Sequence, residues 1–174
     1  MIILLSILLL AAAIIDLKTY RIPNYLILSG ILAALAYHFS SDGFNGLLFS
    51  VSGIVVGIGL LIIPYLMGGM GAGDAKLMGV VGGFLGAKGA FSAFLLIAVV
   101  GGVYALILRL IYKDELKGLS AKIYHGVLSF ILTRKYVPDT GASSPNAPKL
   151  CYGLAIALGT FLYIALNGLG YSLI

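Results

Sequence analysis

The stretch Gly68-Gly69-Met70-Gly71-Ala72-Gly73-Asp74-Ala75-Lys76 joins two long apolar runs and sets an aspartate among glycines. In a chain this apolar, an ionisable residue is costly and by default indicates a functional site. Glycine permits backbone conformations closed to other residues and lets another chain approach closely. The competing interpretation is a glycine-rich turn in which Asp74 merely caps the next helix. A second aspartate in the same kind of setting, Asp16, favours the functional interpretation.

The composition is that of a polytopic membrane protein. Of the 174 residues, 61% are hydrophobic and only 10% are charged. Soluble domains carry roughly 25% charged residues, so we expect no sizeable soluble domain. The single cysteine, Cys151, excludes an internal disulfide and a multi-cysteine metal site. His38 and His125 lie far apart in the sequence, so we read both as loop or interface residues and expect no metal.

The first apolar run, residues 2–15, predicts a membrane span that is not removed. No basic residue precedes this run, as a signal peptide would require. The run alone is too short for a hydrocarbon core roughly 30 Å thick, so the helix is expected to continue to about residue 20. This places Asp16 near the membrane boundary.

Further apolar runs, separated by turn residues at 40–43 and 87–89, predict an all-α chain of about six spans. Together they form one membrane-embedded domain, 1–174. A series of glycines in the fourth run marks faces for close helix packing, namely Gly79, Gly82, Gly83 and Gly86. The expected spans are residues 2–20, 24–39, 44–67, 75–86, 90–112 and 150–169.

The segment 113–149, between the last two expected spans, is predicted to be a cytoplasmic loop. Apolar residues recur at helical spacing in its first part, from Leu116 to Ile131, which indicates an amphipathic helix on the membrane surface. Its second part, 137–149, is rich in Pro, Ser, Gly and Asn and is typical of a flexible loop.

The basic residues predict the orientation. With the N-terminus outside, ten Lys and Arg residues fall on the cytoplasmic side and only Lys88 falls outside. Asp16 and Asp74 then both lie at the cytoplasmic edge of the plasma membrane. The net charge of +5 follows from orientation and from contact with anionic lipid, so we expect no nucleic-acid partner.

Two carboxylates at one membrane depth can share a proton if helix packing brings them together, because like charges a few ångströms apart do not both ionise readily. Such a pair is the machinery of an aspartic protease. One member activates a water and the other protonates the developing oxyanion, without a metal or a covalent intermediate. We find no nucleophile-and-base alternative, and the glycines lack the Gly-Lys-Ser/Thr of a phosphate-binding loop.

Both aspartate segments resemble those of the type IV prepilin peptidases, which are membrane aspartic proteases. Gly71-Ala72-Gly73-Asp74 is similar to the family's Gly-x-Gly-Asp signature, and Arg21-Ile22-Pro23-Asn24 follows Asp16 at the family's spacing. The segment Tyr152–Gly159 is similar to the start of the last span, where a proline is usual in place of Cys151. The paired cysteines that follow the first span in larger members are absent, so the chain resembles a short, peptidase-only form.

The resemblance implies an endopeptidase that removes the short basic leader of prepilin-like proteins at the cytoplasmic face. It implies Asp16 and Asp74 as the catalytic pair, and no cofactor, since methylation of the product is not expected of this short form. Two interpretations compete for the residues near the two aspartates. They either contact the substrate, or they set the membrane topology and shape the helices. The candidates for substrate binding or loop shaping are Gly71, Gly73, Lys76, Arg21, Pro23 and Asn24.

The sequence leaves other assignments open. A presenilin-like protease shares Gly-x-Gly-Asp, but usually carries Tyr-Asp where this chain has Ile15-Asp16. An archaeal preflagellin peptidase shares both motifs. A small proton-coupled transporter or channel subunit would use the carboxylates as a proton relay, and would place them near the bilayer midplane. A structural subunit of pilus assembly would leave both aspartates dispensable.

Overall fold

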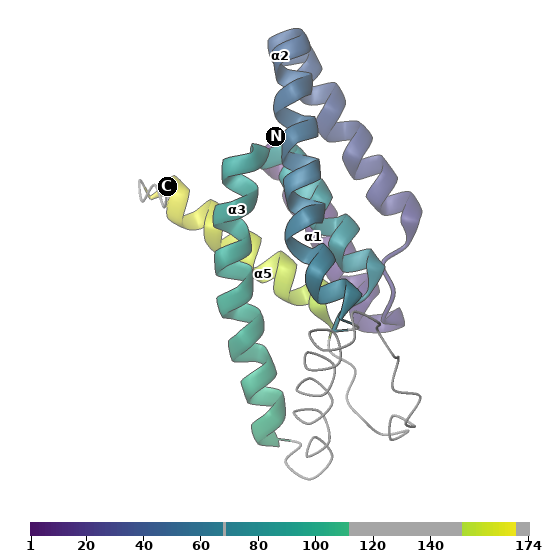
Figure 1. The fold of residues 1–174 in the computed structure, drawn as a ribbon, viewed down its shortest axis with the longest axis vertical. Helices are drawn as coiled ribbons and strands as arrows, with labels where there is room; N and C mark the ends of the chain where they lie inside the picture. Colours follow the sequence, from purple (N-terminus) through teal and green to yellow (C-terminus); the bar gives the residue numbers. More distant parts are fainter. Residues whose placement is uncertain (68, 112–150, 170–174) are drawn as a thin grey trace, which may run out of the picture.

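The computed structural model describes residues 1–67, 69–111 and 151–169. These residues form four helices: α1 (Ile2–Thr19), α2 (Asn24–Leu66), α3 (Ala72–Ile111) and α5 (Tyr152–Gly168) (Figure 1). No strand occurs among them, which confirms the expected all-α fold. The amphipathic helix and loop expected at 113–149 lie outside the described residues.

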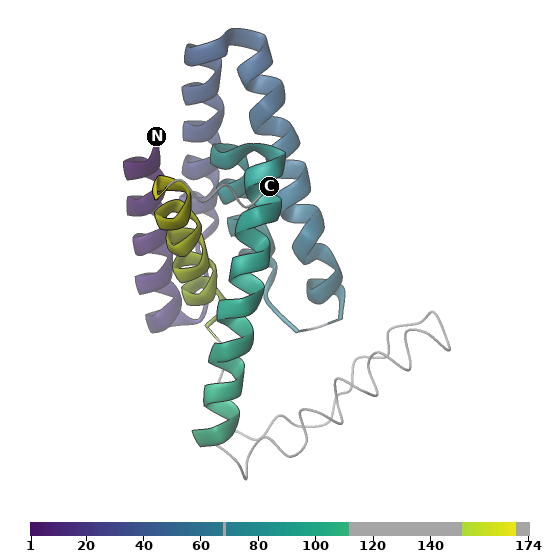
Figure 2. The same cartoon turned by 90° about the vertical axis from the view of Figure 1, so that its left-hand side faces the viewer.

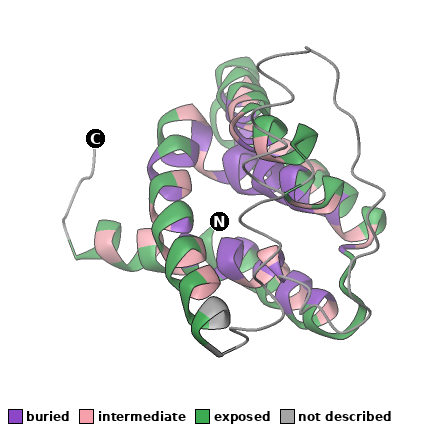
Figure 3. Ribbon diagram, turned by 60° about the horizontal axis from the view of Figure 1, so that its bottom comes forward, coloured by how far each residue is buried: buried purple, intermediate pink, exposed green. Residues whose placement is uncertain are grey.

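Three of the helices are long and apolar enough to cross a membrane: α1, α2 and the part Ala72–Ile107 of α3. α5 is a shorter apolar helix. Much of each helix is exposed (Figure 3), and many of the exposed residues are large and apolar, such as Ile3, Val55 and Val99, which are 77%, 64% and 62% exposed. An outward-facing apolar surface of this extent is suited to lipid rather than to water.

Both α2 and α3 turn back on themselves at a glycine (Figures 1 and 2). Gly43 has φ 57° and ψ −132°, and Gly86 has φ 72° and ψ 178°. Both conformations favour glycine because a Cβ atom would clash with the backbone there. The breaks fall at or beside the turns predicted from the sequence, and each divides its helix into two segments.

The first segment of α3, residues 72–85, packs closely against both segments of α2. A Cβ atom on Gly53 would collide with the carbonyl oxygen of Gly82, so the two backbones touch directly. On the other segment of α2, a Cβ on Gly30 would lie 2.7 Å from Cγ1 of Val80. Small residues thus allow the close packing that the glycines of this run predicted.

Two buried polar side chains of α2 close the turn at Gly86. His38 donates from Nε2 to the carbonyl oxygen of Phe84 at 3.1 Å, and Ser50 donates from Oγ to that of Gly83 at 2.9 Å. His38 is therefore an interface residue within a helix, while His125 lies outside the described residues.

α5 packs against both α1 and α3 (Figure 2). Its contact with α3 is close, because a Cβ atom on Gly159 would lie 2.6 Å from the Cα atom of Ile97. The start of α5 is thereby held beside the last turn of α1 and the first turn of α3, where both aspartates lie.

Candidate active site

Asp16 lies in the last turn of α1 and is only 5% exposed. Its Oδ2 atom accepts a hydrogen bond from the backbone N–H of Gly153, in the first turn of α5, at 3.0 Å. Its backbone carbonyl accepts the N–H of Tyr20 at 2.8 Å. Tyr20 ends the helix in the left-handed conformation, with φ 53° and ψ 30°. The chain therefore leaves α1 directly beside the carboxylate.

Asp74 is the third residue of α3 and is 8% exposed. Its Oδ2 atom accepts the backbone N–H of Gly71 at 3.0 Å, and its own N–H donates to the carbonyl of Gly71 at 3.1 Å. This reciprocal pair caps the helix. The span expected from residue 75 thus begins earlier, at Ala72, because the carboxylate reaches back and supports the turn before it. The predicted capping role is real, but it uses one carboxylate oxygen only.

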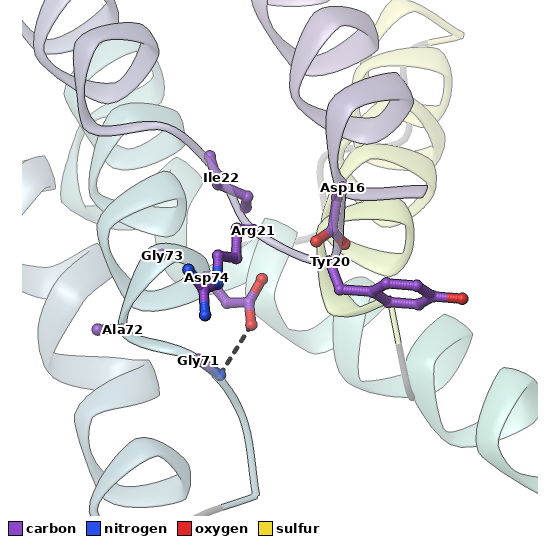
Figure 4. A pocket seen from close by; sticks show the side chains of 8 residues that line it. All are labelled: Asp16, Tyr20, Arg21, Ile22, Gly71, Ala72, Gly73 and Asp74. Atoms are coloured by element: carbon purple, nitrogen blue, oxygen red, sulfur yellow. Dashed lines mark hydrogen bonds between the residues drawn. The ribbon is translucent and has the colours of Figure 1, made fainter. Parts of the chain in front are cut away.

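Asp16 and Asp74 line one pocket of about 230 Å³. Figure 4 shows both carboxylates turned toward the same space, while the ring of Tyr20 points away from it. Their charges interact unfavourably when both groups are ionised. Within the described residues no hydrogen bond joins the two carboxylates directly. At roughly 30 Å³ for each water, the pocket has room for several water molecules.

The pocket wall is made of two non-helical stretches and the start of α3. Besides the aspartates, the lining residues are Tyr20, Arg21, Ile22, Gly71, Ala72 and Gly73. A Cβ atom on Gly73 would lie 3.2 Å from Cβ of Ile22, so this glycine lets the stretch after α1 pass close to α3. A Cβ on Gly71 would make only an ordinary contact, 3.4 Å from Oδ2 of Asp74. The contribution of Gly71 is therefore its N–H group.

Lys76, Pro23 and Asn24 lie beside the pocket and do not line it. Lys76 donates from Nζ to Oδ1 of Asn24 at 3.1 Å, which ties the first turns of α3 to the start of α2. Pro23 is the N-cap of α2, and its carbonyl accepts the N–H groups of Leu26 and Ile27. Of the six neighbouring candidates, the structure brings Gly71, Gly73 and Arg21 to the pocket and places the other three at helix starts.

Several residues were not assigned to the site from the sequence: Tyr20, Ile22 and Ala72, which line the pocket, and Cys151 and Gly153 at the start of α5. Gly153 belongs to the segment Tyr152–Gly159 that resembles the family, but nothing in the sequence pairs it with Asp16. Cys151, just before the first residue of α5, is 5% exposed. Burial raises the pKa of its thiol, and the charges of Asp16 and Asp74 raise it further.

In the described part of the chain, no group of three or more His, Cys, Asp or Glu residues could hold a metal ion.

The model of the type IV leader peptidase family matches residues 3–106, more than half of the 174 residues. The matched range contains both aspartates and every residue that lines the pocket. No curated protein and no solved structure matches the chain. The match confirms the resemblance seen in the two aspartate segments, and the chain belongs to the type IV leader peptidase family.

Proposed function

We propose that the protein is a membrane aspartic endopeptidase that removes the basic leader of prepilin-like proteins at the cytoplasmic membrane face. One observation carries this proposal. The carboxylates of Asp16 and Asp74, from two different helices, face one pocket, and each is held through a single oxygen by a backbone N–H. Membership of a leader peptidase family supports the same reaction class.

The proposed reaction uses the two carboxylates and one water. The ionised carboxylate takes a proton from the water, whose oxygen attacks the scissile carbonyl carbon. The protonated carboxyl gives its proton to the carbonyl oxygen as negative charge develops there. In the collapse of the tetrahedral intermediate the C–N bond breaks and the leaving nitrogen takes a proton from the carboxyl that first accepted one, while one hydroxyl of the intermediate returns its proton to the other carboxylate. The free oxygens of Asp16 and Asp74 are the groups that perform these transfers.

The pocket offers room for an extended substrate backbone. Gly73 presents no side chain beside Asp74, and the stretch Tyr20 to Pro23 runs outside any helix. Glycine at such positions lets a second backbone approach closely. Arg21 adds a positive charge to the wall and suits an acidic group of the substrate or a lipid phosphate.

We further propose one domain of six spans, with the pocket on the cytoplasmic side. The breaks in α2 and α3 give four antiparallel segments, and α1 and α5 add two more. The turns of α2 and α3 lie at one end of the bundle, and the end of α1 and the starts of α3 and α5 lie toward the other (Figure 1). The distribution of basic residues, ten against one, assigns the pocket end to the cytoplasm.

The direct test is cleavage by the purified protein in liposomes. The substrate is a prepilin-like protein with its basic leader, and the products are measured by intact mass. One cut at the end of the leader is expected. A folded protein that cuts nothing, or that cuts at scattered sites, would contradict the proposal. In the first case, a pH-sensitive dye inside the same liposomes would test the proton-relay alternative.

A further inference from the structure

The start of α5 is capped by a residue of another helix. The backbone N–H groups of the first helical turn have no partner within their own helix. The N-cap of α5, Cys151, makes no side-chain capping bond. Instead Oδ2 of Asp16 accepts the N–H of Gly153 at 3.0 Å, in a buried contact between residues 137 positions apart. A catalytic candidate of α1 thus supplies the cap of α5.

This contact requires a glycine at position 153. A Cβ atom there would lie 2.8 Å from Oδ2 of Asp16 and 3.1 Å from both its Cβ and its Cγ. Atoms that overlap in this way force a shift of the side chain or of a helix. α1 and α5 are both packed, and Asp16 is 5% exposed, so little room exists for a shift that keeps the hydrogen bond.

We infer that Gly153 is a positioning residue for Asp16: its N–H fixes one carboxylate oxygen, and its missing side chain leaves the space for this contact. The inference concerns a residue outside the range 3–106 that the family model matches. Its importance for catalysis rests on the proposed function. Gly71 holds Asp74 through the same kind of bond. In each carboxylate, one oxygen is therefore fixed by a backbone N–H and the other is available to a water molecule. The position of the Asp16 carboxylate depends on how α5 packs against α1 and α3.

The kinetic test is Gly153→Ala with two control variants in α5. Because Gly153 does not line the pocket, the Michaelis constant should stay near the wild-type value. The kcat should fall by about 100-fold, the loss expected when a catalytic group is misplaced by about 1 Å. Gly159→Ala disturbs the contact of α5 with Ile97 without touching Asp16, so it should lower thermal stability and lower kcat far less than Gly153→Ala does. Gly168→Ala, which meets nothing within 4 Å, should change neither quantity.

A stability cycle tests the contact without any substrate. Melting temperatures are measured for wild type, Gly153→Ala, Asp16→Ala and the double variant, using a thiol-reactive dye that reaches the buried Cys151 on unfolding. The Gly153→Ala change should lower the melting temperature more in wild type than in the Asp16→Ala background, where the clashing carboxylate is gone. Gly159→Ala should lower it equally in both backgrounds.

Two results would overturn the inference. One is an equal effect of Gly153→Ala in both backgrounds, including failure of both proteins to fold. The other is a Gly153→Ala enzyme with wild-type kcat. Absence of cleavage by the wild-type protein is a different failure, because it overturns the proposed function while the stability cycle still reports on the contact.

Discussion

Gly153 donates its backbone N–H to Oδ2 of Asp16 at 3.0 Å, and so joins the start of α5 to the end of α1. The corresponding bond of Asp74 comes from Gly71, only three residues earlier in the chain. One carboxylate is therefore fixed by its own turn and the other by a distant helix. The site is complete only when α1, α3 and α5 are assembled, which couples helix packing to the geometry of the reaction.

The two glycines of the Gly-x-Gly-Asp segment should respond differently to substitution. Gly73→Ala places a Cβ 3.2 Å from Ile22 and pushes on the pocket wall, whereas Gly71→Ala keeps its N–H and makes only ordinary contact. We expect kcat/KM to fall by about tenfold for Gly73→Ala, equal to about 1.4 kcal/mol, and to stay near wild type for Gly71→Ala. Steady-state cleavage by the two purified variants measures this. An equal loss of kcat/KM in both variants would show that the contact between Gly73 and Ile22 does not determine the activity.

Alanine substitution should destabilise the protein to different extents at the two helix breaks, Gly43 and Gly86. Gly43→Ala meets nothing within 4 Å, so its cost is the strain of placing alanine in a backbone conformation that favours glycine, about 1–3 kcal/mol. Gly86→Ala adds the same strain, and its Cβ also collides with the ring of Phe49. We expect Gly86→Ala to be the less stable variant by about 1–3 kcal/mol, the usual cost of overpacking. Chemical unfolding in detergent compares the two, and an equal loss would contradict the packing at the turn.

The thiol of Cys151 should be dispensable for cleavage. It lies near both carboxylates, but it is buried, does not line the pocket and has a raised thiol pKa. A reactive cysteine needs an accessible thiolate. We expect Cys151→Ala to keep kcat near wild type, and the native protein to react slowly with maleimide at neutral pH. Loss of cleavage in a folded Cys151→Ala protein would instead point to thiol chemistry.

The sequence predicts well those features that one local segment determines. Asp16 and Asp74 stand out because a carboxylate in an apolar run is costly, and the breaks at Gly43 and Gly86 fall where turn residues interrupt the apolar runs. The sequence predicts the start of α3 three residues late, because the glycines before Asp74 are typical of a loop. In the structure Ala72 and Gly73 already belong to the helix, because the carboxylate of Asp74 caps its first turn.

Features that depend on two distant segments were not predictable in this way. The bond of Lys76 to Asn24 and that of Gly153 to Asp16 each require the helices to be docked first. A backbone N–H leaves no signature in the sequence, since every residue except proline has one. The sequence therefore gives no indication that Gly153 positions Asp16. This role follows only from the contact between the two residues in the folded chain.

The most direct test of the central claim, that both carboxylates act on one water, is the single-turnover cleavage rate of four proteins in liposomes. These are wild type, Asp16→Asn, Asp74→Asn and the control Asp42→Asn, in which the replaced carboxylate is exposed beside the turn of α2. Asparagine keeps the shape of the side chain and removes the charge. We predict a loss of at least about 100-fold for Asp16→Asn and for Asp74→Asn, and none for Asp42→Asn. Wild-type cleavage by a folded Asp16→Asn or Asp74→Asn protein would contradict the account.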